Sequence, residues 1–156
     1  MITSTAPIRR WVELASLRRR LASMLYEGLP VFGIAVAGCL VPQVAIGMIF
    51  KIALPGILIW LHLFLVLGVY FVFVWHYRGQ TLAMQTWSLQ LVDARSGKTP
   101  ALSQLVLRYV LAWPSLLLIT SGLGILWAAM VDRDRQFPHD RLSGIRVIFN
   151  PVRPME

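Results

Sequence analysis

Two apolar stretches decide the fold of this chain. Residues 28–50 read GLPVFGIAVAGCLVPQVAIGMIF, residues 52–75 read IALPGILIWLHLFLVLGVYFVFVW, and Lys51 separates them. Neither stretch contains an Asp, Glu, Lys or Arg. Each is longer than the roughly 20 residues that an α-helix needs to cross the hydrocarbon core of a bilayer. The sequence therefore predicts an all-α polytopic membrane protein with two clear transmembrane helices.

The composition of the whole chain supports a membrane class. Of 156 residues, 57% are hydrophobic and 14% are charged, against roughly 45–50% and about 25% in soluble domains. One cysteine and the absence of a long charged repeat exclude a disulfide scaffold and a coiled coil. The net charge of +8 does not come from a basic patch interleaved with aromatic residues, so no nucleic acid is expected as a partner.

The helix boundaries follow from charge and proline. We expect the first helix to begin near Leu21 or Ala22 and to end near Val41–Pro42, because proline cannot continue a helix interior. The second helix is predicted over Ile52–Trp75, with Pro55 in its first turns, where a missing N–H donor is tolerated.

A third apolar segment, Leu105–Val131, has two readings. It contains Pro114 in its middle and the weak point Ser121–Gly124 beyond it. One spanning helix would carry the C-terminus to the opposite side of the membrane. A broken or re-entrant hairpin that bends at Thr120–Gly124 keeps both ends on one side, and such backbone is tolerated when protein covers it.

Basic residues give the orientation. The positive-inside rule places the N-terminus and the middle loop in the cytoplasm and the Lys51 turn outside. The basic C-terminal tail also favours the cytoplasm, which supports the hairpin. The residues that carry these statements are Arg9, Arg10, Arg18, Arg19, Arg20, Arg78, Arg95, Lys98, Arg133, Arg135, Arg141, Arg146 and Arg153.

Two short β-like segments, Leu89–Val92 and Ile145–Phe149, are predicted on the cytoplasmic side. Their pairing requires both to lie on one side of the membrane, as the hairpin reading does. Residues 1–21 form a basic cytoplasmic segment, either a helix in the headgroup plane or a solvated tail. Residues 22–149 are the transmembrane domain, and residues 150–156 are a C-terminal tail.

Charged side chains near the apolar segments are the candidate functional residues. Arg20 and Glu27 are seven residues apart, which places them on nearly one helix face, about 10.5 Å apart along the axis. Counted by depth, Tyr70 lies at the level of Glu27, and Arg108 lies near the start of the third segment. We therefore expect Glu27, Tyr70 and Arg108 to meet. They form either a carboxylate site that binds a cation or exchanges protons, or a structural polar clasp between helices.

His62 lies near the predicted bilayer midplane. It is either hydrogen-bonded between helices or part of a proton relay. The histidines and Cys39 are scattered along the chain, so neither a metal nor a cofactor is expected. His139, Asp140 and Ser143 are the residue types of a catalytic triad, but they are crowded along a polar segment, and no phosphate-binding loop or nucleophile elbow occurs. We do not expect an enzyme.

Several short motifs, in order, are similar to those of one family. Arg19–Ser23 followed by Glu27, Gly79–Met84, Leu91–Asp93, Leu107–Tyr109 and Gln136–Gly144 resemble the RDD family of small bacterial membrane proteins, over about Arg18–Phe149. That family is named for one arginine and two aspartates, which map to Arg20, Glu27 and Asp140. Glu27 departs from the usual aspartate and moves the carboxylate outward by one methylene group.

The resemblance implies a multi-pass protein of the bacterial inner (plasma) membrane. We expect Asp140 either to reach Arg20 at the cytoplasmic face or to be a solvated residue in a capping turn. Transport has been proposed for the family, and some members are linked with sodium/proton antiport. We therefore expect a subunit for transport of a monovalent cation or proton, in which Glu27 carries the exchange and Arg20, Arg108 and Asp140 set its charge. A homo-oligomer or a partner membrane protein would complete the pathway in the lipid bilayer. The alternative is a non-transporting structural or adaptor protein that binds lipids or a partner membrane protein.

Overall fold

The first apolar stretch forms one long helical unit. In a computed structural model that describes residues 13–131 and 136–150, α1 (Leu17–Ala35), η1 (Val36–Leu40) and α2 (Val41–Phe50) follow one another without a break. The predicted end at Val41–Pro42 is therefore wrong, and the helix also starts earlier than expected. The helix continues through Pro42 because the π-helical turn η1 directly precedes α2. Proline has no backbone N–H to donate, and the wider π-helical turn accommodates this missing hydrogen bond.

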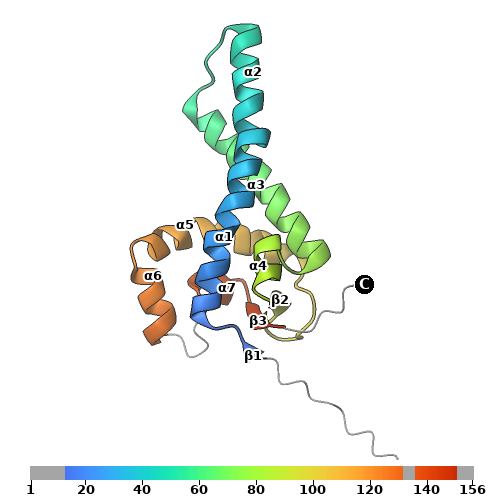
Figure 1. Cartoon of the computed structure of the whole chain (residues 1–156), viewed down its shortest axis with the longest axis vertical. Coiled ribbons are helices and arrows are strands. Elements are labelled where there is room, and N and C mark those ends of the chain that lie inside the picture. The colour runs from blue at the N-terminus through green and yellow to red at the C-terminus, as the bar shows by residue number, and fades with distance from the viewer. Residues whose placement is uncertain (1–12, 132–135, 151–156) are drawn as a thin grey trace, which may run out of the picture.

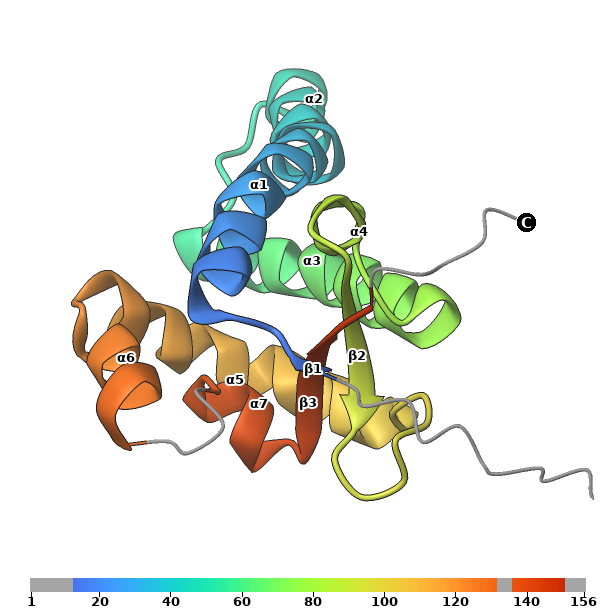
Figure 2. The same cartoon turned by 60° about the horizontal axis from the view of Figure 1, so that its bottom comes forward.

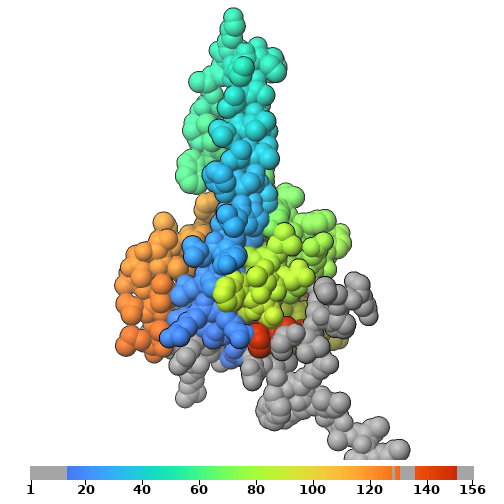
Figure 3. Space-filling model, viewed as in Figure 1, coloured from blue at the N-terminus to red at the C-terminus, as the bar shows by residue number. Residues whose placement is uncertain are grey.

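The second apolar stretch forms α3 (Gly56–Arg78), which begins and ends later than predicted. Lys51 adopts a left-handed conformation (φ 54°) after α2, and Pro55 caps α3 instead of entering it. Gly79 (φ 67°) ends the helix, as glycine commonly does in the left-handed region. Figures 1 and 3 show α2 and the start of α3 projecting as a narrow arm above the rest of the chain.

Apolar side chains on this arm are exposed, among them Met48 (75%) and Ile57 (74%). Three helical stretches, Leu17–Phe50, Gly56–Arg78 and Leu102–Thr120, are long and apolar enough to cross a membrane. Because water would not tolerate so continuous an apolar surface, lipid is its natural surrounding. The predicted fold class of a helical membrane protein is confirmed.

The third apolar segment is broken, as the hairpin reading predicts. It consists of α5 (Leu102–Thr120), α6 (Leu123–Leu126) and η2 (Trp127–Val131). The break falls at Ser121–Gly122, where Gly122 has φ 81°. Gly124 then lets α6 lie against the end of α5, since a Cβ there would stand 2.9 Å from the backbone nitrogen of Ile119. Figure 1 shows α5 running across the base of α1 and α3, and α6 turning downward from its end.

The predicted strand pairing is confirmed. β2 (Leu89–Asp93) and β3 (Ile145–Phe149) are antiparallel with Leu91 opposite Val147, and β1 (Glu13–Leu14) adds a third strand, in the order β1-β3-β2. β1 takes the place of the C-terminal part of a headgroup-plane helix, and residues 1–12 lie outside the described part of the chain. Residues 151–156 of the predicted tail also lie outside it.

The sheet constrains the topology. β2 precedes α5 and β3 follows η2, so the segment between them must return to the side from which it left. β1 and β3 pair as well, which places the start of α1 on that same side. The described chain therefore contains two helical units that can cross a membrane and one broken segment whose two ends meet at the sheet, and Figure 2 shows β1, β3 and β2 side by side.

The core lies where the helices meet this sheet. Leu91 and Ile145 from the strands and Leu105 from α5 are fully buried, and Trp75 and Tyr109 pack against them. Two short helices, α4 (Leu82–Thr86) and α7 (Pro138–Leu142), complete this layer.

Candidate functional site

A cavity of about 490 Å³ lies between α1, α3, α5, α7 and the sheet. Its polar lining comes mainly from the sheet end of the helices, and its apolar lining extends along them into the arm. On α1, for example, the lining changes from Arg20, Ser23 and Glu27 to Val31 and Ala35. The cavity therefore has a polar end and an apolar end.

Glu27 lies at the polar end and accepts hydrogen bonds from two hydroxyl groups. Tyr70 on α3 donates to Oε1 of Glu27 over 3.4 Å, and Thr81 donates to Oε2. Thr81 is also the N-cap of α4, where its hydroxyl accepts from the backbone N–H of Met84 at 3.2 Å. The Thr81 hydroxyl group therefore caps α4 and, in the same position, donates to the Glu27 carboxylate.

Arg108 and Asp140 form an ion pair beside this group. Nε of Arg108 lies 2.7 Å from Oδ1 of Asp140, and both residues are buried. The Arg108 guanidinium also stacks over the Trp75 ring, 4.2 Å from the ring centroid. Arg108 affects the Glu27 carboxylate through its charge, while Asp140 is the group to which it bonds.

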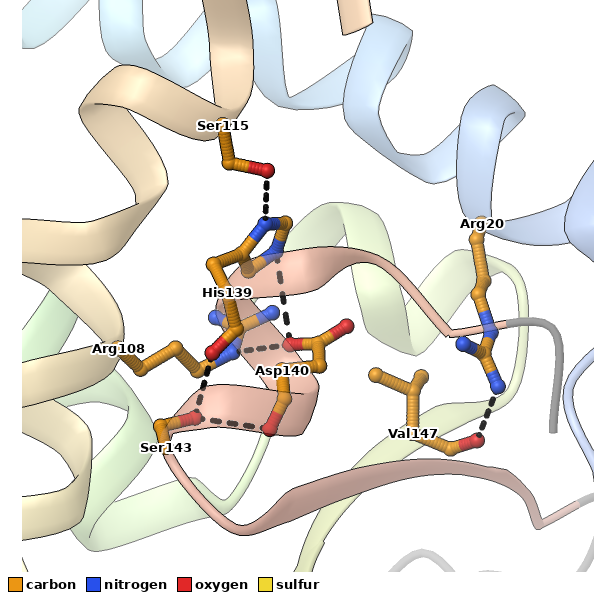
Figure 4. A network of polar contacts seen from close by, with 7 residues as sticks. All are labelled: Arg20, Arg108, Ser115, His139, Asp140, Ser143 and Val147. Carbon is orange, nitrogen blue, oxygen red and sulfur yellow. Dashed lines mark hydrogen bonds and ion pairs between the residues drawn. The ribbon is translucent and has the colours of Figure 1, made fainter. Parts of the chain in front are cut away.

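His139 and Ser115 add a second contact between α7 and α5. Nδ1 of His139 lies 2.8 Å from the Ser115 hydroxyl, and Nε2 lies 3.5 Å from Oδ1 of Asp140 (Figure 4). Since a carboxylate can only accept, the neutral imidazole carries its proton on Nε2, and Nδ1 accepts from Ser115.

The sequence of α7 explains how these groups are held. Pro138 starts the helix, and the Ser143 hydroxyl ends it by donating to the carbonyls of His139 (2.7 Å) and Asp140 (3.0 Å). Gly144 follows with φ 69°. One turn of helix therefore fixes His139 and Asp140 side by side and leaves Ser143 bonded to backbone, away from the imidazole that a triad would need.

Burial and charge set the protonation states on α7. The pKa of His139 is lowered to about 4, because burial and the charges of Arg108 and Arg20 together outweigh the Asp140 carboxylate, which raises it. Burial would raise the pKa of Asp140, but the charges of Arg108, His139 and Arg20 hold it below its ordinary value. At neutral pH the cluster therefore contains a neutral imidazole and an ionised carboxylate.

Arg20 lies on the other side of Asp140 from Arg108 (Figure 4). Nη2 of Arg20 donates to the carbonyl oxygen of Val147 on β3 at 3.0 Å, and the side chain is buried. Arg20 therefore connects α1 to the sheet, and its charge also acts on Asp140.

Of the residues singled out from the sequence, Arg20, Glu27, Arg108 and Asp140 all line the cavity, and Tyr70 bonds to Glu27. His62 does not line it. Within residues 13–131 and 136–150, no group of three His, Cys, Asp or Glu side chains could hold a metal ion.

Sequence reasoning missed three contributors: Thr81, Ser115 and the imidazole of His139. Thr81 belongs to the Gly79–Met84 motif, which carried the family resemblance without a role for the hydroxyl. The Asp following His139 was visible, but the partner of the imidazole, Ser115, lies 24 residues away. No local pattern could have joined them.

Comparison with known proteins gives a family and one relative. A model described as the RDD family matches residues 14–144 of the chain. An uncharacterized protein of Rickettsia prowazekii (strain Madrid E) is 35% identical over 98 residues, which cover 63% of this chain and 53% of that protein. The chain thus spans about half the length of the curated relative it matches. No solved structure matches the chain.

Proposed function

This multi-pass membrane protein belongs to the RDD family, and on that premise we propose that it is a subunit for proton-coupled cation exchange. Glu27 is the exchanging carboxylate. Protonated, it is neutral within the membrane segment; deprotonated, it attracts a cation into the cavity. The two states alternate as the cavity gains and loses its cation.

One observation carries this proposal. Glu27 lines a cavity and is held by neutral hydroxyl donors, Tyr70 and Thr81, while the nearby Arg108 bonds to Asp140. A carboxylate locked to an arginine would stay ionised, whereas one held by hydroxyl groups can either take a proton or face a cation. A charged group in a membrane segment costs a few kcal/mol, so its presence calls for a role.

The remaining residues position Glu27. The Arg108–Asp140 pair sets the charge beside it, and Arg20 ties α1 to the sheet. Two crossing segments and a hairpin are few for a complete pathway, so a homo-oligomer or a partner membrane protein supplies the rest. The distribution of basic residues supports a cytoplasmic N-terminus, and membership of the RDD family supports a bacterial inner membrane.

A structural or adaptor role is the second candidate. It is favoured by the burial of Arg108, Asp140 and His139, which join α5 to α7 as a closed polar clasp. In that case the basic cytoplasmic segments of the protein would bind lipids or a partner membrane protein. We propose no enzymatic role, since Ser115 bonds to the imidazole but does not line the cavity.

Flux measurements on the full chain in proteoliposomes separate the two candidates. A pH-sensitive dye inside the vesicles would report proton movement driven by gradients of Na⁺, Li⁺, K⁺ or an organic ammonium ion. We expect Glu27→Gln to reduce this flux at least tenfold and Glu27→Asp to retain part of it. Asp93→Asn is the matched control, because Asp93 bonds to Ser96 and Gln104 outside the cavity.

Proton flux that is measurable and unchanged by Glu27→Gln would contradict the exchange mechanism. Absence of flux with every cation, together with stoichiometric co-purification of another membrane protein, would favour the adaptor role.

A further inference from the structure

We propose that the cavity binds a hydrophobic organic cation, such as an amine or quaternary ammonium or phosphonium ion with an apolar body. This inference rests on the proposed exchange function and names its substrate class. Three features of the cavity support it: the size, the aromatic wall and the position of the carboxylate.

The volume of about 490 Å³ is the size of a small-molecule pocket. A bare alkali cation occupies far less space and requires several oxygen ligands around it. Glu27 and Thr81 offer oxygen atoms at the polar end, whereas the arm end is lined by side chains such as Val31, Leu63 and Leu67. A ligand that fills this space must therefore present apolar surface to most of the wall.

Aromatic rings follow one another along the wall. Trp75 contacts Phe71 (centroids 5.1 Å apart), Phe71 contacts Tyr109 (6.2 Å), Tyr109 contacts Trp113 (6.2 Å) and Trp113 contacts Trp60 (6.2 Å). All five residues line the cavity. Aromatic faces attract cations and apolar groups alike, which is the basis of quaternary ammonium recognition. This series of rings leads from the ion pair at the polar end to the arm.

The charges at the polar end favour a cation over an anion. Each arginine already has an acceptor, since Arg108 bonds to Asp140 and Arg20 bonds to the Val147 carbonyl. His139 is neutral at physiological pH and bonds to Ser115. Glu27 accepts from Tyr70 and Thr81, both neutral. The carboxylate of Glu27 is thus the charge in this part of the described structure that a ligand can complement.

The groups that face Glu27 come from each packed element and are Tyr70 on α3, Thr81 at the start of α4 and the charge of Arg108 on α5. When the organic cation enters, Glu27 gives up its proton to water and forms an ion pair with the cation. When the cation leaves, the carboxylate takes a proton back. No bond in the ligand is made or broken.

A matched pair of probes tests the proposal. Tetraphenylphosphonium and tetraphenylborate have nearly the same shape and opposite charges, and the tryptophans of the wall report binding by fluorescence. With the full chain in detergent or nanodiscs, we expect saturable binding of tetraphenylphosphonium, with at least tenfold preference over tetraphenylborate. Binding should release protons into weakly buffered solution, since Glu27 changes its state.

Two variants locate the site. Glu27→Gln should weaken tetraphenylphosphonium binding at least tenfold and abolish the proton release. Trp113→Leu, in the wall away from the ion pair, should weaken it roughly threefold to tenfold, the size of a cation–aromatic contact. Asp93→Asn should bind as the unchanged chain does. Circular dichroism and size-exclusion profiles verify that each variant is folded.

The results separate this inference from the exchange function. Equal binding of the two probes, or full binding by folded Glu27→Gln, overturns the organic-cation site. If Na⁺ or K⁺ drives Glu27-dependent proton flux while tetraphenylphosphonium does not bind, the substrate class is wrong and the exchange function stands. If tetraphenylphosphonium binding depends on Glu27 but no cation moves protons across the vesicle membrane, the site stands and the exchange function fails.

Discussion

Asp140→Ala removes the acceptor for a buried guanidinium. Asp140 is 1% exposed and Arg108 is 8% exposed, and they bond at 2.7 Å. Loss of one partner from a buried pair costs about 3–5 kcal/mol, because the other charge stays buried without compensation. For a chain of this length that corresponds to a fall in Tm of roughly 6–20 °C. Thermal unfolding in detergent, followed by the loss of the monodisperse size-exclusion peak, measures this fall.

The double variant Arg108→Met/Asp140→Leu tests the cause. It removes both charges and keeps an apolar filling, so it should be less destabilised than Asp140→Ala by at least about 2 kcal/mol. Lys98→Ala, on an exposed turn, is the control and should stay within about 0.5 kcal/mol of the unchanged chain. The reasoning is refuted if Asp140→Ala behaves like Lys98→Ala, or if the double variant is destabilised as much as Asp140→Ala.

Two further predictions concern pH and topology. The pKa of His139 falls from an ordinary 6.5 to about 4 in the fold. The neutral imidazole therefore contributes fully to the free energy of unfolding above pH 6.5. This contribution is lost as pH drops toward 4, because the unfolded chain then binds a proton that the folded chain does not bind. This contribution amounts to about 3 kcal/mol. The Tm of the unchanged chain should fall between pH 7 and 4.5, and the Tm of His139→Gln should fall less. Equal slopes of Tm against pH for the two proteins would refute the assignment. In a Cys39→Ser background, Asn150→Cys and Lys51→Cys should react with a membrane-impermeant thiol reagent from opposite sides. Labelling of both from one side would exclude the hairpin.

Much of the fold could be predicted from the sequence because the deciding quantities are local. The length of the charge-free stretches predicts two crossing helices, and the Ser121–Gly124 weak point predicts the break in the third segment. The helix ends were less predictable. Pro42 looked like a terminator, but a π-helical turn before it lets the helix continue to Phe50. Nothing in the local sequence distinguishes a proline that ends a helix from one that such a turn accommodates.

The sequence predicted which residues form the candidate site better than it predicted which of them bond to each other. Depth counting placed Glu27 and Tyr70 at one level, and the hydrogen bond between them joins residues 43 positions apart. The same counting placed Arg108 with Glu27 and Tyr70, whereas Arg108 bonds to Asp140. This pairing depends on the direction in which α7 presents its side chains, and Asp140 lies 32 residues beyond Arg108.

The class of protein, the number of apolar segments and the few charged residues within them can therefore be predicted from the order of residues, because a bilayer selects on length and polarity, which can be counted along the chain. The pairing of those residues depends on how the folded segments pack. The β2–β3 pairing brings both ends of the third segment to one side of the membrane. The α7 helix positions Asp140 for its ion pair with Arg108, and the hydroxyl group of Thr81 at the α4 cap donates a hydrogen bond to Glu27. Each of these contacts joins distant segments, so its geometry exists only after the helices and the sheet have packed.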